Sequence, residues 1–258
     1  MKPITWRRPP LLAAVVLSAC VGLVGGSLAA WAIYARFGPV ERVVTQIAPQ
    51  PGGGAGGAPS IAQVGQQAAA SVVEIATKPL DSQSLLTGTT GLVDGFAVSS
   101  DGLVVTSIHA IRGATVLRVA TADGHAYDAT VVLADAAHGV ALLRATGAQQ
   151  LAYLPFAGQR AIPGDAAIAV ARVPFAGLSL SAGTVSSTGR QLTVGGGEPA
   201  LKDVMTVDAT SDASADGAPL LNGSGQVSGV IVDAGAAAPG VVALSAAAAA
   251  ALVRSATS

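Results

Sequence analysis

Three histidines and a series of aspartates are the side chains of this sequence that are best suited to acid and base chemistry. His109 directly follows an apolar run, in the segment TSIHA, and the chain has two other histidines, His125 and His138. An imidazole titrates near neutral pH and is the commonest general base in enzymes. A single histidine after a strand is nevertheless structural or exposed more often than catalytic, so the surrounding elements must decide its role.

Composition excludes several other chemistries. The one cysteine, Cys20, lies in the apolar N-terminal segment, which excludes an intramolecular disulfide and a cysteine-based zinc site in the rest of the chain. The formal net charge is -1, and no run of Lys or Arg occurs beyond the extreme N-terminus. This charge pattern excludes a typical nucleic-acid-binding protein. We expect no cofactor and no metal.

Short β-branched runs separated by turn residues make up most of the chain after residue 60. Turns such as SDG, ADG and NGSG divide them and are typical of hairpins. The spacing predicts an antiparallel all-β domain. The expected strands are 72–77, 96–99, 103–107, 115–120, 129–133 and 140–144, and then 166–171, 178–187, 204–207, 219–221, 227–232 and 240–244. After them, the alanine-rich stretch 245–254 predicts one terminal helix, with Ser245 as its N-cap.

The N-terminal segment is typical of a membrane anchor. Residues 11–34 contain no charge, and about 20 apolar residues are enough for one helical span. Basic residues precede this span (Lys2, Arg7, Arg8), which favours a cytoplasmic N-terminus at 1–10, an anchor at 11–36 and the remaining chain outside. Two alternatives stay open, because LSAC resembles a lipobox around Cys20 and the Arg7-Arg8 pair resembles an export signal. Residues 37–60, rich in Gly and Pro, predict a flexible linker.

Three segments resemble those that bear the catalytic residues of HtrA-like serine proteases, which have the trypsin fold. The run GFAVSSDGLVVTSIHAI has the GF pair, the two strands around a D-G turn and the TxxH of that family. VVLADAAHGVALLRA is similar to the segment with the triad aspartate, and VDATSDASADGAPLLNGSGQVSGV to the segment with the serine. Because their order and spacing agree across about 61–246, the chain is identified as a degenerate member of that family.

The resemblance implies a trypsin-like domain at 61–258, made of two packed antiparallel barrels with the active site in the cleft between them. Barrel 1 is expected at about 61–148 and barrel 2 at about 149–245. Many family members continue into a peptide-binding PDZ domain. We expect none in this chain, which ends soon after the second barrel.

Two of the three catalytic positions are occupied by residues that depart from the family pattern. His109 matches the general base, but Gly139 stands at the position of the triad aspartate and Asp216 at that of the nucleophilic serine. The oxyanion loop corresponds to Ser214, Ala215 and Gly217. A carboxylate that attacks a peptide gives a more reactive anhydride, and its charge repels the developing oxyanion. We therefore expect Asp216 not to act as a nucleophile.

A hydrogen bond between Asp216 and His109 is our hypothesis for the remaining pair, and the alternative is that His109 has no partner. Ser214 is expected not to replace the nucleophile. Asp135 and His138 are expected to face solvent, and the aspartates at 208 and 212 to have surface or loop-capping roles.

These positions predict a membrane-anchored pseudoprotease outside the cytoplasm that binds polypeptide or an envelope protein, and oligomers are possible. An active serine endopeptidase with a displaced triad and a structural assembly protein are the alternatives. A lipoprotein or a secreted protein would be the alternative location.

Overall fold

The structure, a computed structural model, describes residues 59–79, 91–173, 177–193, 200–210, 215–233 and 240–257. The expected anchor at 11–36 and nearly all of the expected linker at 37–60 lie outside these ranges. Within the ranges, no helix combines the length and the apolar character that a membrane span requires.

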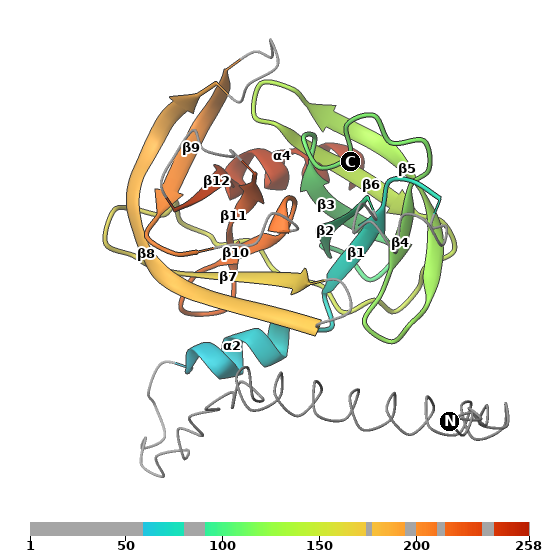
Figure 1. Ribbon diagram of the computed structural model, residues 1–258, viewed down its shortest axis with the longest axis horizontal. Helices are drawn as coiled ribbons and strands as arrows, with labels where there is room; N and C mark the ends of the chain where they lie inside the picture. Colours follow the sequence, from blue (N-terminus) through green and yellow to red (C-terminus); the bar gives the residue numbers. More distant parts are fainter. Residues whose placement is uncertain are drawn as a thin grey trace, which may run out of the picture. The chain divides into compact units, whose positions relative to one another are not determined.

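The first barrel is a closed antiparallel sheet in the order β1-β2-β3-β6-β5-β4 (Figure 1). Strand β2 starts earlier than expected, because Leu92 pairs with Ala76 at the end of β1. The six strands are β1 (Val72–Ala76), β2 (Leu92–Ala97), β3 (Leu103–Ser107), β4 (Arg118–Ala120), β5 (Ala126–Asp135) and β6 (Val140–Ala145).

The second barrel repeats the design with the order β10-β11-β12-β9-β8-β7. Its strands are β7 (Ala166–Val173), β8 (Gly177–Leu192), β9 (Leu201–Val207), β10 (Pro219–Leu221), β11 (Val227–Val232) and β12 (Val241–Ser245). The double antiparallel barrel expected from the resemblance is therefore confirmed.

One apolar cluster joins the two barrels. It contains Phe96 and Leu142 of barrel 1 together with Ile168, Val230 and Leu244 of barrel 2, all at most 3% exposed. Strands β3, β11 and β12 are buried along their whole length. The continuous apolar runs of these strands, in place of strict alternation, suit burial on both faces.

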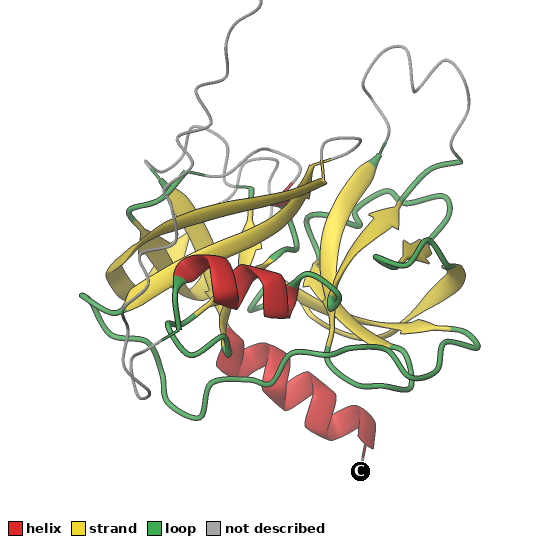
Figure 2. Cartoon of the chain, turned by 90° about the horizontal axis from the view of Figure 1, so that it is seen from below, coloured by secondary structure: helices red, strands yellow, loops and turns green. Residues whose placement is uncertain are grey.

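In the described ranges, two helices accompany the barrels (Figure 2). The expected terminal helix is α4 (Ala246–Thr257), and the hydroxyl of Ser245 accepts the N–H of Ala247 at 3.4 Å. Helix α2 (Ile61–Ala68) was not expected. It begins with a capping box in which Ser60 and Gln63 satisfy each other's backbone N–H, and it buries Val64.

Candidate functional site

His109 lies in the turn that follows β3. The backbone N–H of Ile108 donates to the carbonyl of Gly139 at 2.8 Å, which ties this turn to the loop before β6. The side chain of His109 is 34% exposed. A strand that is buried along its whole length therefore ends by presenting an imidazole at the surface.

Asp216 reaches the same place from the turn before β10, although it is more than a hundred residues away in sequence. Its side chain is only 6% exposed. The carbonyl of Asp216 accepts the N–H of Asp94 at 3.0 Å, and the N–H of Gly217 donates to the carbonyl of Ile231 at 2.9 Å. Backbone bonds to β2 and β11 thus fix this turn against both barrels.

The two side chains are in direct contact. Nδ1 of His109 lies 2.5 Å from Oδ2 of Asp216, and the other carboxylate oxygen accepts the hydroxyl of Ser107 at 2.5 Å. The same hydroxyl oxygen accepts the N–H of Ala110 at 2.9 Å. Ser107, Asp216 and His109 therefore form a continuous chain from hydroxyl through carboxylate to imidazole.

The carboxylate favours a protonated imidazole. The hydrogen bond that Asp216 accepts from the imidazole raises the pKa of His109 above its ordinary value of 6.5, against burial and the charge of Arg112, which lower it. The charges of Asp216 and Asp233 add to the increase. His109 is consequently charged over a wider pH range than a free histidine.

Glycine is required at position 217. Its φ is +89°, and a Cβ there would lie 2.1 Å from the carbonyl oxygen of Asp94 and 2.2 Å from Oγ1 of Thr106. Neither a backbone carbonyl nor a buried threonine has room to retreat. The absence of a side chain at 217 is what lets the Asp216 turn approach β2 and β3.

Gly139 lies beside the His109 turn but presents no side chain to it. Its φ is +69°, and a Cβ there would lie 2.7 Å from a methyl group of Leu201. An aspartate at this position would therefore require a different backbone conformation or movement of Leu201. No acid approaches His109 from position 139.

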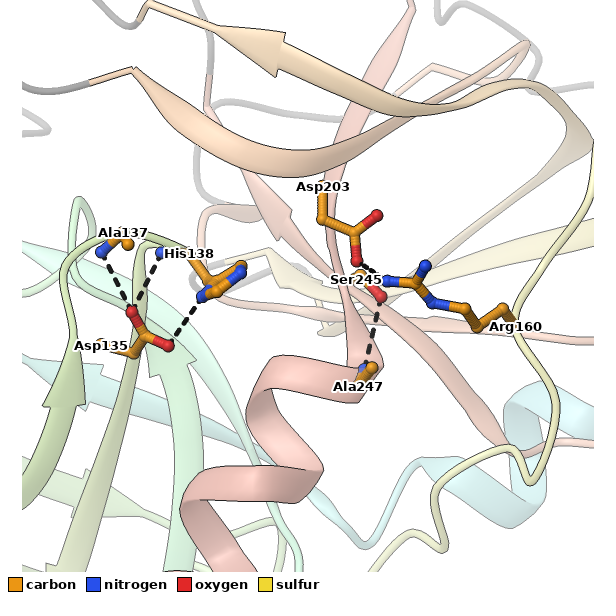
Figure 3. A network of polar contacts seen from close by, with 7 residues as sticks. All are labelled: Asp135, Ala137, His138, Arg160, Asp203, Ser245 and Ala247. Atoms are coloured by element: carbon orange, nitrogen blue, oxygen red, sulfur yellow. Dashed lines mark hydrogen bonds and ion pairs between the residues drawn. The ribbon is translucent and has the colours of Figure 1, made fainter.

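The neighbouring Asp135 and His138 bond each other. Nδ1 of His138 lies 2.7 Å from Oδ2 of Asp135, whose other oxygen accepts the N–H groups of Ala137 and His138 (Figure 3). Their side chains are 31% and 35% exposed, so they are half-buried rather than fully turned to solvent. Figure 3 also shows Arg160 bonded to Asp203 on the facing barrel.

Asp94 is a buried carboxyl group that sequence reasoning missed. It is 1% exposed, and its Oδ2 accepts the backbone N–H of Arg172 of β7 at 2.8 Å. Burial raises the pKa of Asp94 to about 8, and the charges of Glu74 and Asp216 act in the same direction. The chain reads VDGF here, so the signal was a charged residue directly before the GF pair.

Of the other residues expected at or near the site, one is buried, one is exposed and two lie outside the described part of the chain. Ala215 is fully buried, and its carbonyl accepts the N–H of Ala218. Asp208 is exposed, and its backbone N–H donates to Thr184. Ser214 and Asp212 lie outside the described residues.

In the described residues, metal-ligating side chains do not cluster, and the cavity along β8 and β9 is lined by neither His109 nor Asp216. In the described ranges, no cluster of three or more histidine, cysteine, aspartate or glutamate side chains could hold a metal ion. A cavity of about 450 Å³ lies along β8 and β9, with Thr184, Arg190 and Asp208 among its lining residues. His109 and Asp216 do not line that cavity.

Comparisons with known proteins find serine proteases. The sequence profile of the family described as "Trypsin-like peptidase domain" matches residues 93–230. A probable periplasmic serine endoprotease, DegP-like, of Chlamydia pneumoniae is 37% identical over 140 residues, which are 53% of this chain and 27% of that protein. A putative serine protease, HhoB, of Synechocystis is 32% identical over 142 residues, which are 54% of this chain and 34% of that protein. The match thus spans about a quarter to a third of these relatives.

Solved structures give the same fold. The serine endoprotease of Yersinia pestis superposes with a TM-score of 0.61 at 23% identity, over 77% of this chain and 66% of that one. The inactive form of a Mycobacterium tuberculosis protein, crystallised with a serine-to-alanine mutation, gives 0.58 at 25% identity, over 74% of this chain and 89% of that one.

Proposed function

The chain belongs to the family of trypsin-like peptidase domains, and we propose that it binds polypeptide or an envelope protein without cleaving it. The observation that carries this proposal is the contact of Asp216 with both His109 and Ser107. In family members that cleave peptides, a serine hydroxyl at the matching position must reach both the histidine and the substrate carbonyl. Here the matching position holds a carboxylate that is already engaged on both oxygens.

The carboxylate opposes peptide cleavage in two ways. Attack by Asp216 on a peptide would give an anhydride, which is more reactive than the amide, so the step runs uphill. The negative charge of Asp216 would also oppose the oxyanion that forms on the substrate. In a characterised triad enzyme, loss of the nucleophile alone lowers turnover by on the order of 10⁶.

In the described part of the chain, the geometry gives no support to Ser107 as a displaced nucleophile. Its hydroxyl is fully buried and donates to Asp216 rather than to His109. A nucleophile must be open to substrate. The site therefore supports binding better than serine-type hydrolysis.

The location proposed for the domain is outside the cytoplasm, held by a single helix at 11–36. The support comes from the uncharged run in the sequence and from relatives whose names describe periplasmic enzymes. Replacing Leu17 and Val21 by arginine places two charges in the apolar run, and we expect the full chain then to leave the membrane fraction. Unchanged membrane association of this variant would contradict the anchor.

Incubation of the full chain with unfolded casein and with a fluorophosphonate probe tests the proposal. We expect the chain to retain casein in a pull-down, but neither to cleave it nor to react with the probe. His109→Ala serves as the matched variant. Cleavage or labelling that disappears in this variant would show a working serine protease and overturn the proposal.

A further inference from the structure

All three histidines of the chain contact a carboxylate through Nδ1. His109 contacts Asp216 at 2.5 Å, His138 contacts Asp135 at 2.7 Å, and His125 contacts Asp123 at 3.1 Å. The three contacts are alike in the atoms involved. They differ in the burial of the carboxylate.

Only in the His109 pair is the carboxylate withdrawn behind a more exposed ring. The Asp216 side chain is 6% exposed and the imidazole 34%, whereas Asp135 and His138 are exposed to similar extents, 31% and 35%, and Asp123 and His125 are both well exposed. The second oxygen of Asp216 is held by the buried hydroxyl of Ser107. The carboxylate is thus fixed from behind, and the imidazole lies between it and the surface.

This arrangement is that of an orienting acid and a general base. A carboxylate bound to Nδ1 keeps the proton of the neutral imidazole on that nitrogen, so that the lone pair lies on Nε2. It also stabilises the imidazolium that forms when Nε2 accepts a proton. Asp216 can perform both tasks from its present position, although its sequence position is that of the nucleophile.

We propose that Asp216 orients His109 as a general base, and that this pair activates water to hydrolyse small esters with good leaving groups. In this step Nε2 of His109 accepts a proton as the water oxygen bonds to the acyl carbon. The bond from the acyl carbon to the leaving oxygen then breaks, and its electron pair leaves with that oxygen. The products are a carboxylic acid and the leaving alkoxide or phenolate, and His109 returns its proton to solvent.

The proposal goes beyond polypeptide binding and does not require peptide cleavage. The leaving amine of a peptide must be protonated, and its oxyanion needs strong stabilisation, whereas a phenolate leaves without protonation. A positioned general base contributes about 10²- to 10⁴-fold in rate. As His109 accepts the proton, its new positive charge offsets the charge of Asp216, which otherwise repels the oxyanion.

The hydrolysis of p-nitrophenyl acetate by the full chain tests the proposal. His125→Gln and His138→Gln are matched controls, because each removes an imidazole with the same Nδ1 contact but a more exposed carboxylate. We expect kcat/KM to fall at least tenfold in His109→Gln and about tenfold in Asp216→Asn, and to change less than twofold in either control. An equal loss in the controls, or none in His109→Gln, would overturn the proposal.

The pH dependence separates orientation from a merely structural role of Asp216. The wild-type rate should rise with pH as His109 loses its proton, with a midpoint above 6.5, because Asp216 raises the pKa of the imidazole. In Asp216→Asn the midpoint should move down and the plateau should be lower. A lower plateau with an unchanged midpoint would contradict the assigned role.

Mass spectrometry of the wild type during turnover gives a test that does not depend on variant folding. Water attack leaves no acyl group on the protein, so we expect no acetylated side chain that forms and decays at the turnover rate. Such an adduct would overturn water activation. The ester result is separate from the casein result: loss of ester hydrolysis alone leaves polypeptide binding intact, and casein cleavage overturns the proposed function by itself.

Discussion

The pair of His109 and Asp216 and the pair of His138 and Asp135 use the same contact in different surroundings. His138 lies in the turn between β5 and β6, where the carbonyl of Ala137 accepts the N–H of Lys202 of barrel 2. The carboxylate of its partner Asp135 is 31% exposed and accepts the N–H groups of Ala137 and His138 in the adjacent turn. The carboxylate of Asp216 is 6% exposed and accepts the hydroxyl of Ser107 of β3, in the other barrel.

From this difference we expect the burial of the carboxylate, rather than the contact distance, to decide how much a histidine–aspartate pair contributes to stability. An exposed pair contributes about 0–1 kcal/mol to stability, whereas removal of one partner of a buried pair costs several times more. Gly139, which the sequence resemblance aligns with the family's acid, lies next to His138. The buried acid that contacts His109 is Asp216.

The largest expected difference between the two regions concerns their glycines. Gly217→Ala brings a Cβ against the carbonyl of Asp94, and we expect a loss of about 4 kcal/mol or more. Gly139→Ala meets a movable methyl group of Leu201 and should cost about 1–3 kcal/mol. Urea unfolding of the full chain measures both losses.

Gly113→Ala is the matched control for these glycines, because its φ of +68° is close to that of Gly139 and no atom lies within 4 Å of its Cβ. It reports backbone strain alone. Equal losses at 113 and 217 would contradict the close approach of the Asp216 turn to β2.

The second difference is the sign of the pH dependence. Asp94 has a folded pKa of about 8 against 3.8 unfolded, so the unfolded state ionises first, and stability falls as pH rises from about 4 to about 8. Between about pH 4 and pH 8 the wild type should lose up to about 1.4 kcal/mol of stability per pH unit through Asp94, and we expect Asp94→Asn to remove this loss.

The contribution of Asp135 to stability changes with pH in the opposite direction. Burial raises its pKa, but the hydrogen bonds from His138 and Ala137 prevail and lower it below 3.8. Its contribution is therefore present above about pH 4 and is lost as pH falls through the folded pKa. Unfolding curves of Asp94→Asn and Asp135→Asn against pH that share one sign would contradict the contrast.

The third difference is the cost of removing each acid. Asp216→Ala leaves the hydroxyl of Ser107 without its acceptor and His109 without its partner, and we expect a loss of about 2–3 kcal/mol near pH 6. Asp135→Ala should cost about 1 kcal/mol or less. Equal losses of stability for the two variants in chemical denaturation would contradict the difference between the two pairs.

The sequence, with its family resemblance, predicted the double barrel and the terminal helix. It also led to the hypothesis that Asp216 bonds His109. Short β-branched runs between turn residues make strands visible, and the resemblance supplied their arrangement. Helix α2 was missed although Ser60 and Gln63 form a capping box, because its eight residues make only about two turns and show too short an apolar period.

Asp94 and Ser107 could not be assigned from the sequence in the same way. Asp94 lies in β2 and Ser107 in β3. In a strand, the sequence pattern alone predicts only on which face of the sheet a side chain lies. Their roles arise from a turn more than a hundred residues away, whose carbonyl and carboxylate reach them only in the folded chain. Long-range contacts of this kind leave no local periodicity.

The most direct test of the account is a two-dimensional NMR titration of the three imidazoles in the full chain and in Asp216→Asn. The account predicts that His109 titrates above 6.5 in the wild type, and that its midpoint falls in the variant. A His109 midpoint that is the same in both proteins would contradict the central claim that Asp216 is the partner of His109.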